Sequence, residues 1–208
     1  MSKVYSTLGL GVLISGISGY MSSYGLIPYS LIYLLLIGCM IAELFYMFTR
    51  HSKFSREILS PANFYASTFA IGAAFGLVFS LDMSKKELLI LKEIYTAAFI
   101  YTAAIFLALT IFSLMTVRRL KIFYGCIFTS LILSIVSFFI FNATLYSIIG
   151  LIVGSLYIVV DTQLMINKTE SGIFEPYEDA RSLFYNLAKI FIRIVVLLSK
   201  NEKNKKEN

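Results

Sequence analysis

Two long stretches of this sequence are almost free of charged residues. From Val4 to Thr49 the single charged side chain is Glu43, and from Ile122 to Val160 there is none. A membrane-spanning helix needs roughly 20 mostly apolar residues, and both stretches exceed that length. Over the whole chain 58% of residues are hydrophobic and 14% are charged. The sequence therefore predicts an all-α polytopic membrane protein.

Apolar runs and the residues that interrupt them divide the chain into helices. A seventh apolar run is set apart by Asn186, Lys189 and Arg193 within it. We expect one transmembrane helical domain over residues 1–199, followed by a charged tail over 200–208. The seven predicted spans lie at about 4–22, 26–49, 62–81, 94–116, 121–141, 143–166 and 183–199.

The basic residues indicate an orientation. The net charge is +6, but the lysines and arginines lie in short clusters between apolar runs and in the tail. That distribution is typical of cytoplasmic loops, so it argues against nucleic acid and favours a cytosolic N-terminus with a retained first span. A seventh crossing would then place the lysine-rich tail on the opposite side. Either the seventh helix re-enters the membrane or the tail departs from the charge rule.

Polar residues form a stripe on the seventh predicted helix. Ser182, Asn186, Lys189 and Arg193 are spaced by four, three and four positions, which places them on one helix face at about 100° per residue. Such a helix lies either on the membrane surface or within a bundle with its stripe facing a polar cavity. Cys39 and Cys126 lie in apolar runs and are expected to be packing residues.

The C-terminal part contains the segments "VVDTQLMINKTESG", then "LFYNLAKIF", then "LLSKNEKNKKEN". They resemble the D-T-Q segment, the last helix and the charged tail of the Bax inhibitor-1 family of membrane proteins. Weaker similarity extends over nearly the whole chain. The family implies six helices around a central seventh, which here carries the polar stripe. It also implies calcium leak across the endoplasmic reticulum membrane, or the plasma membrane in bacteria, and suppression of cell death.

The resemblance further implies a pH sensor made of two aspartates that share a proton. Asp161 of D-T-Q matches the first, but Asn186 stands at the register position of the second. We therefore hypothesise that Asp161 is ionised and either pairs with Lys189 or accepts a hydrogen bond from the Asn186 amide. Either contact would weaken pH gating, and a fixed Lys189 cation would oppose calcium. Asp161 would make at most a weak metal contact, with calcium as the permeant ion and no cofactor.

Other residues receive more general expectations. Glu43 either reaches the membrane interface or adds a second acidic group to the ion pathway. The family tends to place a basic residue before the third span, where register gives Ser60 and where Arg56 is the nearest substitute. Lys205 and Lys206 resemble a dilysine retrieval signal of the endoplasmic reticulum, although a solvated charged tail explains them equally well.

Two alternatives to a channel were weighed from the residues. An intramembrane enzyme is disfavoured because the single histidine, His51, lies in a loop, and because Asn186 leaves no facing carboxylate pair. A non-conducting scaffold that regulates apoptosis or stress signalling through protein partners stays open. The partners expected on these grounds are the lipid bilayer, calcium ions and cell-death regulatory proteins.

Overall fold

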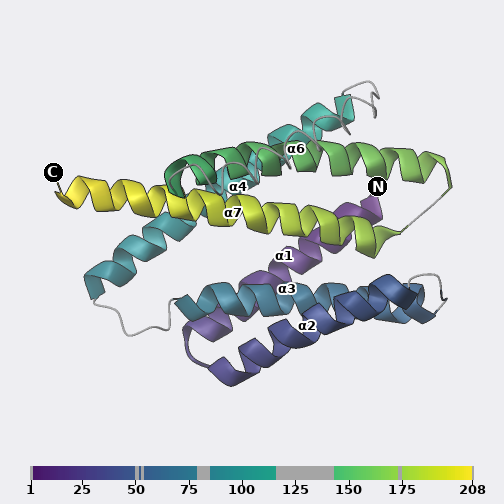
Figure 1. Ribbon diagram of the computed structural model, residues 1–208, viewed down its shortest axis with the longest axis horizontal. Coiled ribbons are helices and arrows are strands. Elements are labelled where there is room, and N and C mark those ends of the chain that lie inside the picture. Colours follow the sequence, from purple (N-terminus) through teal and green to yellow (C-terminus); the bar gives the residue numbers. More distant parts are fainter. Residues whose placement is uncertain are drawn as a thin grey trace. The chain divides into compact units, whose positions relative to one another are not determined.

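The structure is a computed structural model that describes residues 2–49, 52, 54–78, 85–115, 143–172 and 175–207. The described residues are helical almost throughout (Figure 1). The elements are α1 (Ser2–Ser23), α2 (Tyr29–Thr49), the π-helix η1 (Ser55–Leu59), α3 (Ser60–Leu77), α4 (Lys85–Met115), α6 (Ala143–Glu170) and α7 (Pro176–Glu207).

Length and composition make these helices membrane helices. Within the described part of the chain, five helices are long and apolar enough to cross a bilayer: α1, α2, α4, α6 and α7. Large apolar side chains are exposed along them, as at Leu34, Met40 and Phe48 of α2, where Phe48 is 85% exposed. Continuous apolar exposure of this kind is typical of a lipid-facing surface. The prediction of an all-α polytopic membrane protein is confirmed.

The helix ends differ from the predicted spans most at α3, α4 and α7. Helix α4 begins at Lys85, nine positions before the predicted start at about 94. The predicted span 62–81 overlaps α3, which begins at Ser60 and ends at Leu77, and residues 79–81 lie outside the described part of the chain. Helix α3 is not among the five described helices that are long and apolar enough to cross a bilayer. The last helix begins at Pro176, earlier than predicted, and continues into the lysine-rich tail. Pro176 suits the first helical position, and Glu178 and Asp179 complement the positive end of the helix dipole. The predicted span 121–141 lies outside the described residues.

The chain forms two compact units, described here separately. The first contains Met1–Leu88 and Phe174–Phe184, and the second contains Leu89–Ile173 and Tyr185–Asn208. Helix α7 therefore contributes its first turns to one unit and the remainder to the other. The predicted single domain over 1–199 stays a prediction.

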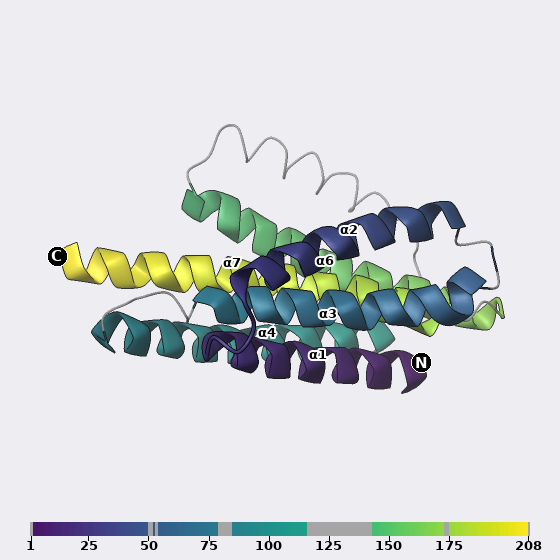
Figure 2. The ribbon, with the colours of Figure 1, turned by 90° about the horizontal axis from the view of Figure 1, so that it is seen from below.

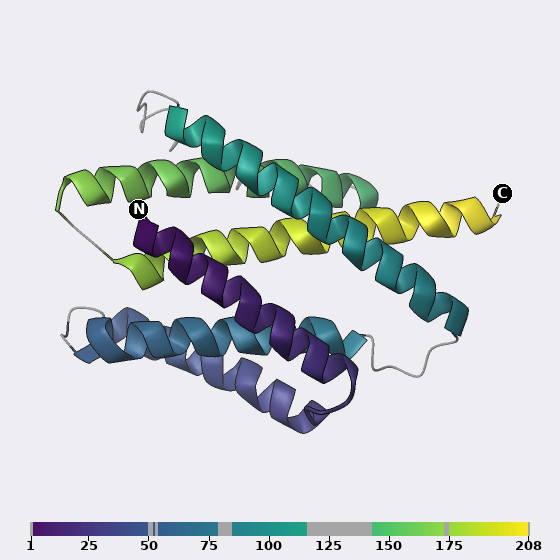
Figure 3. The ribbon, with the colours of Figure 1, turned by 180° about the vertical axis from the view of Figure 1, so that it is seen from behind.

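Close contact between α1 and α3 organises the first unit (Figures 2 and 3). Gly72 of α3 lies against the Ser15 carbonyl of α1, and Gly76 lies against Gly19 one turn further along. Small residues at these positions let the two backbones approach closely, which is how membrane helices gain packing energy in lipid. On the other side of α3, α2 packs through an apolar cluster centred on Ile32 and Ala73.

The π-helix η1 precedes α3 because of Pro61. Proline has no backbone N–H, and its ring collides with the carbonyl four residues earlier in an α-helix. A wider π turn relieves this conflict, and accordingly the Ser60 N–H donates to the Ser55 carbonyl, five residues back. Turns of this kind often occur at functional sites, and Ser60 recurs in the site described below.

In the second unit α6 and α7 run antiparallel (Figure 1). Gly154 of α6 lies beside Ile190, and Gly150 lies beside Arg193 one turn away. A core of Ala98, Ile158, Ile190 and Ile194 joins α4 to both helices. This packing brings Asn186 of the polar stripe against Asp161 of the D-T-Q segment.

Candidate functional site

The predicted Asp161–Asn186 contact is present. The Asn186 amide on α7 donates a hydrogen bond of 2.6 Å from Nδ2 to Asp161 Oδ2 on α6. Asn186 is buried, with 4% of its surface exposed. Hydrogen bonds to a charged acceptor are about twice as strong as neutral ones, so this amide compensates part of the desolvation of the carboxylate. An amide also differs chemically from a second carboxyl group. It donates a hydrogen bond to Asp161, but it does not gain or lose a proton near neutral pH.

The remaining two residues of D-T-Q hold α6 in place. Thr162 and Gln163 are fully buried. The Thr162 hydroxyl donates to the Ile158 carbonyl of its own helix at 2.8 Å. Gln163 Nε2 instead reaches α4, where it donates to the Ser113 carbonyl and lies 3.3 Å from Ser113 Oγ. Ser113 Oγ in turn donates to the Val159 carbonyl at 3.0 Å. The motif therefore makes one contact to α7, through Asp161, and a set of hydrogen bonds to Ser113 of α4, through Gln163 and the Val159 carbonyl. We call this Gln163–Ser113–Val159 set the clasp.

Replacing Gln163 with leucine is expected to lower the free energy of unfolding by about 1–2 kcal/mol, because it removes a buried interhelical hydrogen bond while keeping side-chain volume. Thr162→Val is the matched control, since the Thr162 hydroxyl bonds only within its own helix in the described contacts. Its expected cost is smaller. Unfolding of the two purified variants in detergent measures the difference, and equal costs would contradict the clasp.

Two cations of the predicted stripe lie over aromatic rings of α6. Lys189 Nζ is 6.0 Å from the centroid of the Tyr157 ring, and Arg193 Cζ is 4.0 Å from the Tyr146 centroid. Gly150 makes room for the arginine, because a Cβ there would lie 2.6 Å from Arg193 Nε. Attraction between a cation and the ring face stabilises such charges away from water. The proposed pairing of Lys189 with Asp161 stays a prediction.

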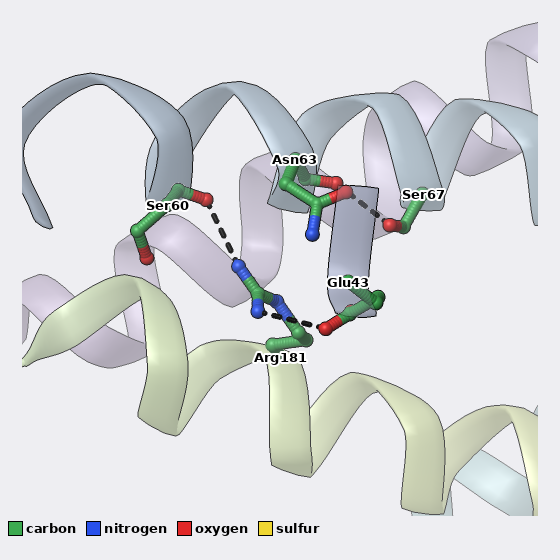
Figure 4. A network of polar contacts seen from close by, with 5 residues as sticks. All are labelled: Glu43, Ser60, Asn63, Ser67 and Arg181. Atoms are coloured by element: carbon green, nitrogen blue, oxygen red, sulfur yellow. Dashed lines mark hydrogen bonds and ion pairs between the residues drawn. The ribbon is translucent and has the colours of Figure 1, made fainter. Parts of the chain in front are cut away.

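A second polar cluster lies in the first unit and was not foreseen as a cluster (Figure 4). Arg181 of α7 donates from Nη1 to Glu43 Oε2 of α2 at 3.2 Å and from Nη2 to the Ser60 carbonyl at 3.0 Å. Its guanidinium also lies over the Tyr46 ring, 5.0 Å from the centroid. The Arg181 side chain is 7% exposed and that of Glu43 is 27% exposed. A largely buried ion pair therefore joins α7 to α2, and a hydrogen bond to the Ser60 carbonyl joins it to α3.

This cluster bears on two of the sequence-based expectations. Glu43 was expected at the membrane interface or in an ion pathway, and the structure places it against Arg181. Ser60 stands at the register position of the family's basic residue, and its carbonyl accepts a hydrogen bond from Arg181 of α7. Arg56, the nearest basic substitute in the sequence, is exposed. Lys205 lies in the last turns of α7 together with Lys206, and their side chains lie outside the described residues.

Calcium coordination was also considered for the described residues. Among them, no group of three or more histidine, cysteine, aspartate or glutamate side chains is placed to hold a metal ion. Asp161 has the Asn186 amide nitrogen beside it, and an amide nitrogen is not a calcium ligand. The weak calcium contact at Asp161 stays a prediction.

Comparison with known proteins supports the resemblance. The sequence profile of the family described as "Inhibitor of apoptosis-promoting Bax1" matches residues 1–203. Bax inhibitor 1 from Sus scrofa, Homo sapiens and Bos taurus is 35% identical to this chain over 71 residues. That aligned stretch covers 34% of this chain and 29% of each relative.

Proposed function

Because this chain belongs to the Bax inhibitor-1 family, we propose that it is an endoplasmic reticulum membrane protein that lets calcium leak across the bilayer and suppresses cell death. The sequence profile and the long apolar helices make the chain a multi-pass membrane protein of that family. Calcium leak, suppression of cell death and the endoplasmic reticulum location are the proposed additions. It includes no enzymatic activity and no cofactor. Calcium is the permeant ion, and the lipid bilayer and cell-death regulatory proteins are the partners.

The observation that carries the mechanism is the Asn186–Asp161 hydrogen bond between α7 and α6. In the family's mechanism, two facing carboxyl groups share a proton, and like-charge repulsion makes such a pair titrate near neutral pH. Here the second position is an amide that stays neutral and keeps donating at every physiological pH. The α6–α7 contact would therefore persist between about pH 6 and 8, and the leak would be small or independent of pH.

The test is calcium flux into proteoliposomes between about pH 6 and 8. The native protein is expected to give a flat, low rate, and Asn186→Asp is expected to give a rate that changes across this interval. The double variant Asp161→Asn with Asn186→Asp is the matched control, because it exchanges the amide and the carboxylate and keeps one of each. Its flux should again be flat. A native protein that already responds to pH would contradict the assignment of Asn186 as the replaced partner.

The amide at position 186 also favours a second candidate function, a non-conducting scaffold that regulates apoptosis or stress signalling through protein partners. The two functions differ in their dependence on Asp161. If protection of cells from death is unchanged by Asp161→Ala while no calcium flux is measurable, the scaffold is favoured. If flux and protection are lost together, the leak pathway is favoured.

A further inference from the structure

The Arg181–Glu43 cluster contains polar groups that its own contacts leave unused. Asn63 of α3 is 3% exposed, and its amide points toward the Arg181–Glu43 pair (Figure 4). Within the described part of the chain, neither Asn63 Nδ2 nor Oδ1 has a hydrogen-bond partner, and neither has Arg181 Nε. Burying such groups without partners is strongly unfavourable, so these atoms point to a ligand that satisfies them.

Neighbouring groups are already engaged elsewhere. Ser67 donates its hydroxyl proton to the Asn63 backbone carbonyl at 2.7 Å. This hydrogen bond does not involve the Asn63 side-chain amide. Two of the three guanidinium nitrogens of Arg181 are used on Glu43 and Ser60. The atoms without any partner are therefore the Asn63 amide nitrogen and oxygen and Arg181 Nε, and each Nη of Arg181 also keeps a second N–H beyond the one used on Glu43 or Ser60.

Charge balance decides what kind of ligand fits. The Arg181 cation already faces the Glu43 carboxylate, so an added ion would bring a charge with no counter-charge into a largely buried site. A small neutral molecule that both accepts and donates hydrogen bonds matches the unused groups. We propose that Asn63 and Arg181 hold internal water, and that this polar cluster is a hydrated recess in the first unit.

The position of the cluster gives that water a route to solvent. Asn63 lies three residues after the start of α3, and Glu43 lies six residues before the end of α2. Because η1 leads directly into α3, Asn63 is eight residues after the start of the helical segment at Ser55. At about 1.5 Å per residue, the two side chains are roughly 9–12 Å along the helices from the connection between α2 and η1. We expect water to enter from that connection, whose basic residues predict the cytosolic side. This inference is independent of whether the protein conducts calcium.

Cysteine accessibility tests the recess. Cys39 and Cys126 are first replaced by alanine, and Asn63→Cys is then introduced. The intact protein in membranes is treated from the side of the α2–η1 connection with a charged, membrane-impermeant methanethiosulfonate reagent, which reacts with thiols that water can ionise. The matched control is Ala70→Cys, because Ala70 is fully buried on the same helix two turns deeper.

We expect Asn63→Cys to be labelled at least about tenfold faster than Ala70→Cys. Equal rates, whether both slow or both fast, would overturn the proposal, since they would indicate a dry cluster or a generally open helix face. A measurement on the native protein guards against misfolding of the variant. Radiolysis of bound water forms hydroxyl radicals that oxidise nearby aromatic rings. The oxidation rate of each ring is normalised to its rate in the unfolded chain. Tyr46, which is 5% exposed, should then be oxidised faster than the fully buried Phe64. Equal protection of both rings would also overturn it.

Discussion

Replacing Gly76 with alanine is expected to destabilise the protein by about 3 kcal/mol, although only one methyl group is added. A Cβ at Gly76 would overlap the backbone carbonyl of Gly19 on α1. Backbone atoms cannot rotate away as a flexible side chain can, so α1 and α3 would have to separate. In lipid this loss of close packing is not offset by a hydrophobic driving force between helices.

Gly16→Ala provides the control on α1. Nothing lies within 4 Å of a Cβ built at Gly16, so alanine there should leave the free energy of unfolding unchanged or raise it by up to about 1 kcal/mol through helix propensity. Unfolding of both variants in mixed micelles measures the contrast. Similar stabilities for the two variants would show that α1 does not approach α3 at Gly76.

Replacing Glu43 with alanine is the second change with a large expected effect. It leaves the Arg181 cation buried beside Tyr46 and Ser60 without its carboxylate. Removing one member of a buried ion pair costs about 3–5 kcal/mol, and the lower end applies because Glu43 is partly exposed. The free energy of unfolding is therefore expected to fall by about 3 kcal/mol.

A double-mutant cycle isolates this interaction. Combining Glu43→Leu with Arg181→Met removes both charges and keeps apolar volume, so the double variant should be much less destabilised than the sum of its parts. Glu57→Ala in η1, where the side chain is exposed, should cost less than about 1 kcal/mol. Additive costs for Glu43 and Arg181 would contradict a direct ion pair.

The sequence predicts one of the two polar sites and not the other, for a physical reason. Asp161 and Asn186 lie in a recognisable segment and on the next helix, so their meeting follows from antiparallel packing of α6 and α7. Glu43 and Arg181 are 138 positions apart, and no periodicity of either helix relates them. Glu43 is expected from the sequence at the membrane interface, which is the ordinary place for a charge on a membrane helix, and Arg181 lies outside the predicted span 183–199.

For helix packing, too, the sequence predicts one part of the structure and not another. The absence of charge over long runs was enough to predict membrane helices, because that signal depends only on composition. It could not distinguish Gly16, with open space around it, from Gly76, pressed against another backbone. The link from Gln163 to Ser113 was equally inaccessible, because it depends on the rotation of α4 about its axis.

The division of α7 between the two units has a consequence for biosynthesis. The first unit needs Phe174–Phe184, which the ribosome makes only after the whole of α6. Until then Glu43 has been inserted into the membrane without Arg181, and Asp161 without Asn186. A chain cut short before Pro176 would leave two carboxylates in the bilayer without these partners, where an ionised group is strongly unfavourable. Helix α7 is translated after both carboxylates and completes both polar sites. A chain that lacks α7 would therefore differ from one that contains it in a way that membrane quality control can detect.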